Sequence, residues 1–196
     1  DQFSQTLFTE YPNKIFLTNS SLGALLLQLF KNNKKLNDVA RLRDGVKTGN
    51  NTEFLSYKPA SPLHKPVLSN SDIERYGFEW HGAYLLYDRD RLARPREEDI
   101  FLAEEKLIIR QTGDRLIAAY DNCQYYALDN IRLLISQSEN ISPLYLLALI
   151  NSRLLTFLHQ VISGELDRVF AQVRIANLEL LPVQFFELVT SSDIRT

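Results

Sequence analysis

The sequence predicts an α+β fold: a twisted, mixed but mainly antiparallel β-sheet with hairpins, packed against a few helices. Short apolar or alternating segments recur between residues 38 and 135 and are separated by glycine, asparagine and aspartate turns, as in a sheet built from hairpins. One long amphipathic segment follows them in the C-terminal half. A run of strands followed by a helix favours the α+β class.

The first 35 residues are predicted to be a linker or docking segment with one apolar helix. Residues 1–19 are expected to be extended or irregular, and their apolar side chains should dock on another surface. Asn19 or Ser20 can cap a helix, and Leu22–Phe30 is apolar on nearly every side, so this helix should be buried or pack on a neighbouring domain. The cations of Lys31–Lys35 favour the end of a helix.

Residues 36–186 are predicted to form the main domain, and residues 187–196 a tail. The first strand of this domain, Asp38–Arg43, leads into a turn that contains Gly45 and Gly49. Glycine permits the positive backbone dihedrals that such a turn needs. The turn should project four polar side chains, those of Lys47, Thr48, Asn50 and Asn51.

Loops and strands are predicted to alternate through the middle of the chain. Three prolines make residues 58–66 a loop, and Ser71 or Asp72 should cap one helical turn that ends at Tyr76. Residues 88–99 carry dense charge of both signs and should form an exposed loop or short helix. Strands are expected at Phe54–Leu55, Ala83–Tyr87, Lys106–Gln111, Leu116–Tyr120, Gln124–Ala127 and Ile131–Ile135.

A single long helix is predicted after Ser142, which caps it, with Pro143 at its first position. Its apolar stripe is spaced by three and four residues and ends before Gly164. Asn151 and Ser152 interrupt the apolar sequence, and we expect a buried hydrogen-bond link from them to the sheet, because unpaired polar groups there would be costly. Strand-like segments close the domain at Val173–Ile175 and Leu178–Val183.

Charge is distributed unevenly along the chain. The net charge is -2, but residues 31–65 contain eight basic and three acidic residues. A basic band on a near-neutral body suits contact with phosphates, although charge runs are also found on any solvated face.

Composition and motifs exclude several classes of site. Cys123 is the one cysteine, so there is no intrachain disulfide framework, which fits a reducing cytoplasm. No apolar run reaches the length of a membrane span, and no signal peptide is recognisable. Zinc-ligand pairs, nucleotide-binding glycine motifs and nucleophile elbows do not occur in the sequence. We therefore expect no catalysis and no metal in this chain, which begins at Asp1, lacks methionine and is expected to be a piece of a longer protein.

One catalytic alternative rests on the triplet Glu104-Glu105-Lys106 at the start of a predicted strand. Metal-dependent nucleases use an acidic residue and a lysine in this spacing, with an upstream carboxylate that Asp90 or Asp99 could supply. A second alternative is a protein-interaction module that self-associates through Leu22–Phe30.

Five pieces of the sequence, taken in order, resemble the TaqI-like C-terminal specificity domain. This is the target-recognition domain of adenine-specific DNA methyltransferases and of fused type II restriction–modification enzymes. The similar segments are the Gly-Val-Lys-Thr-Gly turn with its strand in Leu36–Phe54, Lys65–Tyr76, the strand Tyr84–Tyr87, Glu105–Tyr120 followed by Asp121, and Leu146–Leu154 with a late Leu-Pro at Leu181–Pro182.

The resemblance implies a domain that binds double-stranded DNA and reads bases, mostly through the major groove. A separate amino-terminal methyltransferase domain of the parent protein would bind S-adenosylmethionine and methylate a flipped adenine. The parent could also use magnesium if it cleaves DNA. No cofactor is implied for this chain itself, and no membrane partner.

The candidate DNA-binding residues lie in two turns and beside them. Lys47, Asn50 and Asn51 are candidates for phosphate or base contact, and Thr48 is a further one unless it only shapes the turn. Gln can grip adenine and Arg can grip guanine bidentately, which favours the hairpin tip for reading bases. The remaining candidates are the tip residues Gln111, Thr112 and Arg115 and the phosphate partners Lys65 and Arg110.

Overall fold

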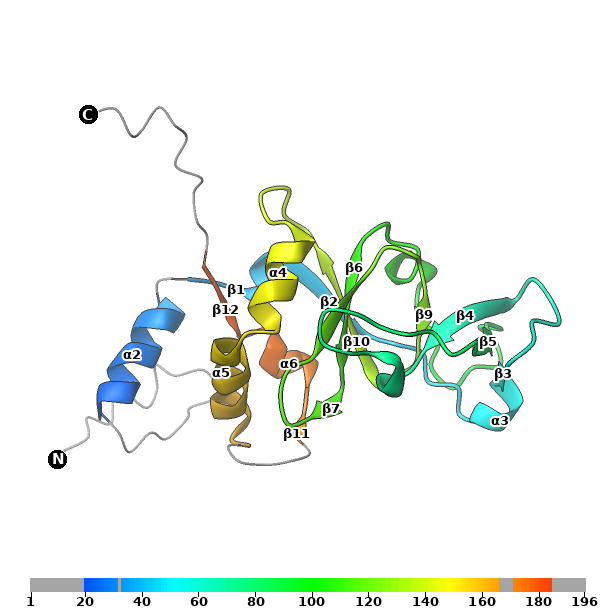
Figure 1. Cartoon of the computed structure of the whole chain (residues 1–196), viewed down its shortest axis with the longest axis horizontal. Coiled ribbons are helices and arrows are strands. Elements are labelled where there is room, and N and C mark those ends of the chain that lie inside the picture. The colour runs from blue at the N-terminus through cyan, green and yellow to red at the C-terminus, as the bar shows by residue number, and fades with distance from the viewer. Residues whose placement is uncertain (1–19, 32, 166–170, 185–196) are drawn as a thin grey trace.

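The computed structural model describes residues 20–31, 33–165 and 171–184 (Figure 1). The extended lead-in expected at residues 1–19, the capping role of Asn19 and the tail expected at 187–196 lie outside the described residues. The fold class is confirmed, because several mostly antiparallel sheets pack with a few helices. The molecule is elongated, with helices at one end and a small sheet at the other (Figure 1).

A four-stranded antiparallel sheet forms the centre of the molecule. Its strands are β2 (Ala40–Asp44), β10 (Ile131–Ser136), β6 (Lys106–Arg110) and β8 (Ala118–Asp121), side by side in that order. β6 and β8 are the two arms of the predicted hairpin, paired from Lys106 with Asp121 to Ile109 with Ala118.

Both faces of this sheet are covered by apolar residues, which explains why its two central strands, β6 and β10, are mostly apolar in sequence. Along β6, Leu107 and Ile109 face one core cluster, which also holds the apolar residues of the helices. Ile108 points the other way, into a cluster formed with the second sheet. The alternation follows from the two-residue period of a strand.

The helical layer covers one face of the central sheet. It comprises α2 (Ser20–Lys31), α4 (Pro143–Ile150), α5 (Arg153–Ser163) and the single turn α6 (Ile175–Leu178) (Figure 1). Leu26 and Leu27 of α2 are buried in this core, so the predicted apolar helix packs on its own domain.

The predicted long helix is divided into α4 and α5, which bend by 67°. The break falls at Asn151, whose amide donates to the carbonyl of Ala118 at 2.9 Å and accepts from the Ala118 N–H at 3.0 Å. Ser152 then caps α5 by accepting from the N–H of Leu155. The expected link from Asn151 to the sheet is confirmed. It lies at the break between α4 and α5, where the sequence predicted one continuous helix.

A second sheet lies beyond the other face of the central one. It consists of β3 (Leu55–Ser56), β5 (Tyr84–Leu86), β4 (His64–Leu68) and β9 (Tyr126–Ala127), in that order, and β9 runs parallel to β4. Residues 64–66 were expected in a loop because of Pro66. β9 pairs only with Val67 and Leu68, so at Pro66 the strand β4 has a neighbour, β5, on one side only. Proline is tolerated at such an edge position because no N–H is needed on the open side.

Short elements complete the described chain. β1 (Lys34–Lys35) pairs with β12 (Pro182–Val183), and β7 (Thr112–Gly113) pairs with β11 (Ala171–Gln172). α3 (Asn51–Phe54) is one helical turn. Further 3-10 turns span Leu36–Asp38, Asn70–Asp72 and Glu98–Ile100.

Several local predictions are wrong in position or type. The first strand begins at Ala40 rather than Asp38, because Leu36–Asp38 forms a 3-10 turn. The turn predicted to run to Tyr76 ends at Asp72 instead, and its cap is Ser69, whose N–H donates to the Asp72 carboxylate. Tyr76, beyond this turn, has a φ of 74° and is half exposed. The closing segment 175–178 is helical instead of extended.

No single helix in the described part of the chain is long and apolar enough to cross a membrane, and only α4 and α5 taken together reach that length and composition.

Replacing Asn151 with alanine should lower the free energy of unfolding by about 1–3 kcal/mol, because it leaves the buried N–H of Ala118 without a partner, whereas the Ala118 carbonyl still accepts from the N–H of Tyr76. Chemical denaturation of the two proteins measures the difference. Asn140→Ala, at an exposed position in the loop before α4, is the matched control and should change it by less than about 0.5 kcal/mol. Equal effects of both substitutions would contradict the assigned role of Asn151.

Candidate nucleic-acid interface

Three polar turns converge at one end of the central sheet. Because the sheet is antiparallel, β2 and β6 end where β10 and β8 begin. Consequently the segments Gly45–Thr48, Gln111–Arg115 and Asp129–Asn130 all lie at this end, which we call the turn end. The two turns predicted separately from the sequence are thus brought together, with Asp129–Asn130 between them.

Gly45 is the point at which the chain passes from the first sheet to the second. Its N–H donates to the carbonyl of Ile131, and the next residue, Val46, donates to the carbonyl of Ala127 at 2.8 Å. A Cβ on Gly45 would lie 2.2 Å from the carbonyl oxygen of Leu128. Glycine is therefore required here by close backbone approach, whereas the prediction had assumed a positive φ. Gly49, at φ +86°, does have the predicted conformation.

The turn that contains Gly45 and Gly49 and runs to Asn51, which we call the glycine-flanked turn, has a buried and an exposed part. Thr48 is 5% exposed, and its hydroxyl donates to the side-chain oxygen of Asn51 at 2.5 Å, so both side chains help to hold the turn. Lys47 and Asn50 are exposed. Within the described chain, no residue pairs with the Lys47 ammonium. Lys47 and Asn50 are thus the members of this predicted set whose polar groups face solvent.

Two asparagines fix the hairpin tip to its neighbours. The side-chain oxygen of Asn70 accepts from the N–H of Gln111 at 2.9 Å, and its amide donates to the Thr112 hydroxyl at 3.3 Å. The side-chain oxygen of Asn130 accepts from the N–H of Asn70 at 3.1 Å, and its carbonyl accepts from Gln111. This amide network holds the tip backbone while the Gln111 side chain stays half-buried at the surface.

The other predicted contacts differ in how firmly they are held. Arg110 is half-buried and donates through Nε to the carbonyl of Ile73 at 2.6 Å. Arg115 is exposed and pairs with the adjacent Asp114 at 2.8 Å. That carboxylate raises the pKa of Arg115, and the pKa of Asp114 is lowered in turn. Lys65 is half-buried on β4, opposite Leu85. An exposed pair such as Arg115–Asp114 contributes little to stability, so the Arg115 guanidinium can leave Asp114 and bind another anion at low cost.

Sequence reasoning missed a group of arginines beside the glycine-flanked turn. Lys47 is bonded through its backbone to Arg94, with N–O distances of 3.1 and 2.9 Å. Arg94, Arg96 and Arg132 all surround the carboxylate of Asp44. These residues are distant in sequence, and the local net charge of 66–108 is acidic, so the pattern of charges gave no signal for them.

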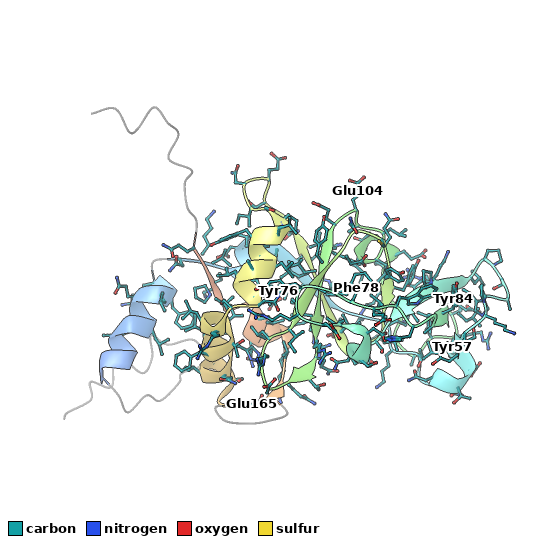
Figure 2. The ribbon with its side chains drawn as sticks, in the orientation of Figure 1. Tyr57, Tyr76, Phe78, Tyr84, Glu104 and Glu165 are labelled. Atoms are coloured by element: carbon teal, nitrogen blue, oxygen red, sulfur yellow. The ribbon has the colours of Figure 1, made fainter. Side chains whose placement is uncertain are left out.

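The triplet that suggested a nuclease is placed unfavourably for that chemistry. Lys106 is fully buried, and its ammonium contacts the Asp121 carboxylate at 2.6 Å and the carbonyl of Phe101 at 2.7 Å. Burial lowers the pKa of Lys106, and Asp121 opposes that shift. Glu104 lies at the end of the sheet opposite the turn end (Figure 2). A lysine enclosed in this way cannot reach a phosphodiester. Among the described residues, no His, Cys, Asp and Glu side chains gather into a group able to hold a metal.

A half-open pocket of about 410 Å³ lies between the second sheet and the 3-10 turn Asn70–Asp72. Apolar side chains, including Leu55 and Leu128, form much of its lining. On the polar side, His81 Nδ1 lies 3.0 Å from the Asp72 carboxylate, which the Ser69 hydroxyl also contacts. Tyr57, another lining residue, is exposed at the second-sheet end of the molecule (Figure 2).

Beneath the hairpin tip, a small cavity of about 10 Å³ separates Gly113–Leu116 from α5. His159 of α5 lines it and is 3% exposed. Its Nε2 atom has no hydrogen-bond partner among the described residues. Burial lowers the pKa of His159 to about 4, so the imidazole is neutral at pH 7.

The sequence model of the TaqI-like C-terminal specificity domain family matches residues 65–183, more than half of the chain. The chain therefore belongs to this family, whose role is DNA target recognition in methyltransferase and restriction–modification systems. No curated protein matches the sequence. The matched span begins at Lys65, so the glycine-flanked turn lies outside it, although that turn packs on matched residues at Ala127, Leu128 and Ile131.

Gly45→Ala should lower the free energy of unfolding by about 1–3 kcal/mol or more, because the new Cβ must displace the backbone of Leu128. Gly77→Ala is the matched control, since nothing lies within 4 Å of the Cβ it would gain, and it should change stability by less than about 1 kcal/mol. Chemical denaturation checks both. A Gly45→Ala protein as stable as the wild type would contradict the close approach.

Stability should fall as the pH is lowered from 7 to 4, in part because of His159. Its folded-state pKa, about 4, lies below the unfolded value of 6.5, so the unfolded chain takes up the proton first. This contributes roughly 3 kcal/mol of lost stability by pH 4. His159→Leu cannot be protonated at this position, so the difference between the two pH profiles isolates the effect. Parallel profiles between pH 7 and 4 would show that His159 is not buried in its neutral form.

Proposed function

We propose that this chain is the DNA target-recognition domain of a restriction–modification adenine DNA methyltransferase, or of a fused methyltransferase–endonuclease, and that it supplies sequence recognition without catalysis. The observation that carries the proposal is the turn end. In a chain of the TaqI-like family, it collects exposed cations and amide side chains on loops held by a rigid sheet.

Loops on a rigid sheet suit recognition of a groove because the sheet fixes where each loop projects. Lys47 and Asn50 supply exposed donors on one turn, and the Gln111–Arg115 tip supplies a second set. Between them, Asn70 and Asn130 fix the tip backbone. This arrangement supports base reading by Gln111 and Arg115, because Gln suits the edge of adenine and Arg that of guanine.

The other predicted residues take supporting roles in this proposal. Lys65 and Arg110 are proposed to contact phosphates at the border of the site, and Thr112 to present its hydroxyl beside Gln111. Thr48 and Asn51 are proposed to shape the turn that presents Lys47, since their side chains bond to each other. Phosphate contacts position the domain, and base contacts specify the sequence.

The partners proposed are double-stranded DNA and an amino-terminal methyltransferase domain of the parent protein. That separate domain would hold S-adenosylmethionine, and magnesium would be needed only if the parent cleaves DNA. We also propose that residues 1–35 lead from that domain, that residues 36–186 form the recognition domain, and that the protein acts in the cytoplasm.

Titration with duplex DNA at several salt concentrations tests the proposal. Binding should weaken steeply with salt, because phosphate contacts release counterions. Lys47→Ala should flatten the slope of log K against log [salt] by about 0.9 if Lys47 contacts one phosphate. The matched control is Lys35→Ala, which removes an exposed lysine from the same basic band. Lys35 lies in β1, which comes before the start of β2, whereas the turn end follows the last residue of β2.

Two results would count against the proposal. The first is failure of the chain to bind any mixed-sequence duplex at low salt. The second is an equal change of slope for Lys47→Ala and Lys35→Ala, which would mean that net charge rather than the turn end governs binding.

A further inference from the structure

Asp44, the last residue of β2, is surrounded by more positive charge than it can neutralise. Its carboxylate contacts Arg132 at 2.5 Å, Arg96 at 3.5 Å and Arg94 at 3.8 Å. Arg96 also donates through Nε to the Asp44 carbonyl at 3.1 Å. The carboxylate therefore gathers three guanidinium groups around one point.

The three arginines are not equally satisfied. Arg132 is nearly buried and also donates to the carbonyls of Val173 and Asp129. Arg94 is about half exposed, and no hydrogen bond joins its guanidinium to any residue in the described part of the chain. Arg94 thus presents donors to solvent while its charge is held close to two other cations.

The local charges repel one another. The pKa of Arg96 is lowered, first by burial and then by the charge of Arg94, and Arg43 adds to the effect. The pKa of Arg132 is lowered by burial, and Arg94 and Arg96 also contribute. Asp129 is the second carboxylate that acts on both arginines. A bound anion would relieve this repulsion.

Several other arginines in the described chain pair with a carboxylate away from Asp44. Arg89 pairs with Glu97 at 2.8 Å, and Arg41 pairs with Asp99 at 2.7 Å. Arg91 contacts Glu53. Asp44 differs from these pairs because three guanidinium groups share its carboxylate.

We propose that Arg94 and Arg96, gathered by Asp44, form a binding site for a phosphate of the DNA backbone. Guanidinium groups recognise phosphate through paired N–H donors and stay charged when partly buried. The site adjoins Lys47, whose backbone is bonded to Arg94. The phosphate held here therefore belongs to the strand that passes the glycine-flanked turn. This inference rests on the proposed function and extends the interface to residues that the sequence did not indicate.

Arg94→Ala tests the site, and Arg41→Ala, near the start of β2 and paired with Asp99, is its control. The two side chains are 48% and 30% exposed, and each substitution removes one positive charge. Both proteins are titrated with the same mixed-sequence duplex across a range of salt concentrations, and circular dichroism verifies their folding. Arg94→Ala should reduce the salt slope by about 0.9 and weaken binding at low salt about tenfold, whereas Arg41→Ala should match the wild type.

A second measurement uses inorganic phosphate as the probe. Phosphate should raise the melting temperature of the wild type and of Arg41→Ala more than that of Arg94→Ala, because it binds the folded site. If the wild type binds DNA but Arg94→Ala and Arg41→Ala have equal slopes, this site is refuted while the proposed function stands. If the wild type binds no DNA, both fall. If phosphate stabilises the wild type but Arg94→Ala leaves DNA binding unchanged, the anion held here is not a DNA phosphate.

Discussion

The approach of Gly45 to the backbone of Ala127 and Leu128 determines how the two sheets are joined. The chain leaves the central sheet at Asp44, and two residues later the N–H of Val46 donates to the carbonyl of Ala127 in β9. A side chain at position 45 would occupy the same space as a carbonyl oxygen. The glycine-flanked turn, the Asp129–Asn130 turn and the arginines at Asp44 therefore keep their relative positions only while this contact is kept. The shape of the turn end depends on the absence of a side chain at Gly45.

At the turn end, the polar groups that build the loops are different from those left facing solvent. Thr48 and Asn51 bond to each other, and Asn70 and Asn130 are occupied by the hairpin tip. Lys47 and Arg94 have no such internal bonds among the described side chains. A polar side chain that is already satisfied gains little from a new partner, whereas an unsatisfied one gains more. This division separates the side chains that hold the loops from those that face solvent, and residue type alone does not reveal it.

Much of the fold could be predicted because its strands carry local signals. Lys106–Gln111 and Ile131–Ile135 are apolar on both faces, and the structure places them between two cores, while Ala83–Tyr87 packs into the core of the second sheet. The break at Asn151 was hidden, since the apolar spacing continues through it and only the bond to Ala118 reveals why the helix stops. The strand through Pro66 was hidden because proline normally argues against a paired strand. The candidate site was predicted less well. Asp44, Arg94, Arg96 and Arg132 come together only through the pairing of distant strands, which no local pattern encodes.

The buried pair Lys106–Asp121 lies at the open end of the β6–β8 hairpin, remote from its tip. Shifting either strand by one residue would separate the two charges in a dry environment, at a cost of several kcal/mol. The alignment of the hairpin is thus set at its base, and Asp121 also holds the following turn through the N–H groups of Cys123 and Tyr125. The tip is relieved of that duty. Substitutions at the tip should therefore leave the pairing of the two arms intact, so this hairpin can vary in sequence at its tip without losing its register.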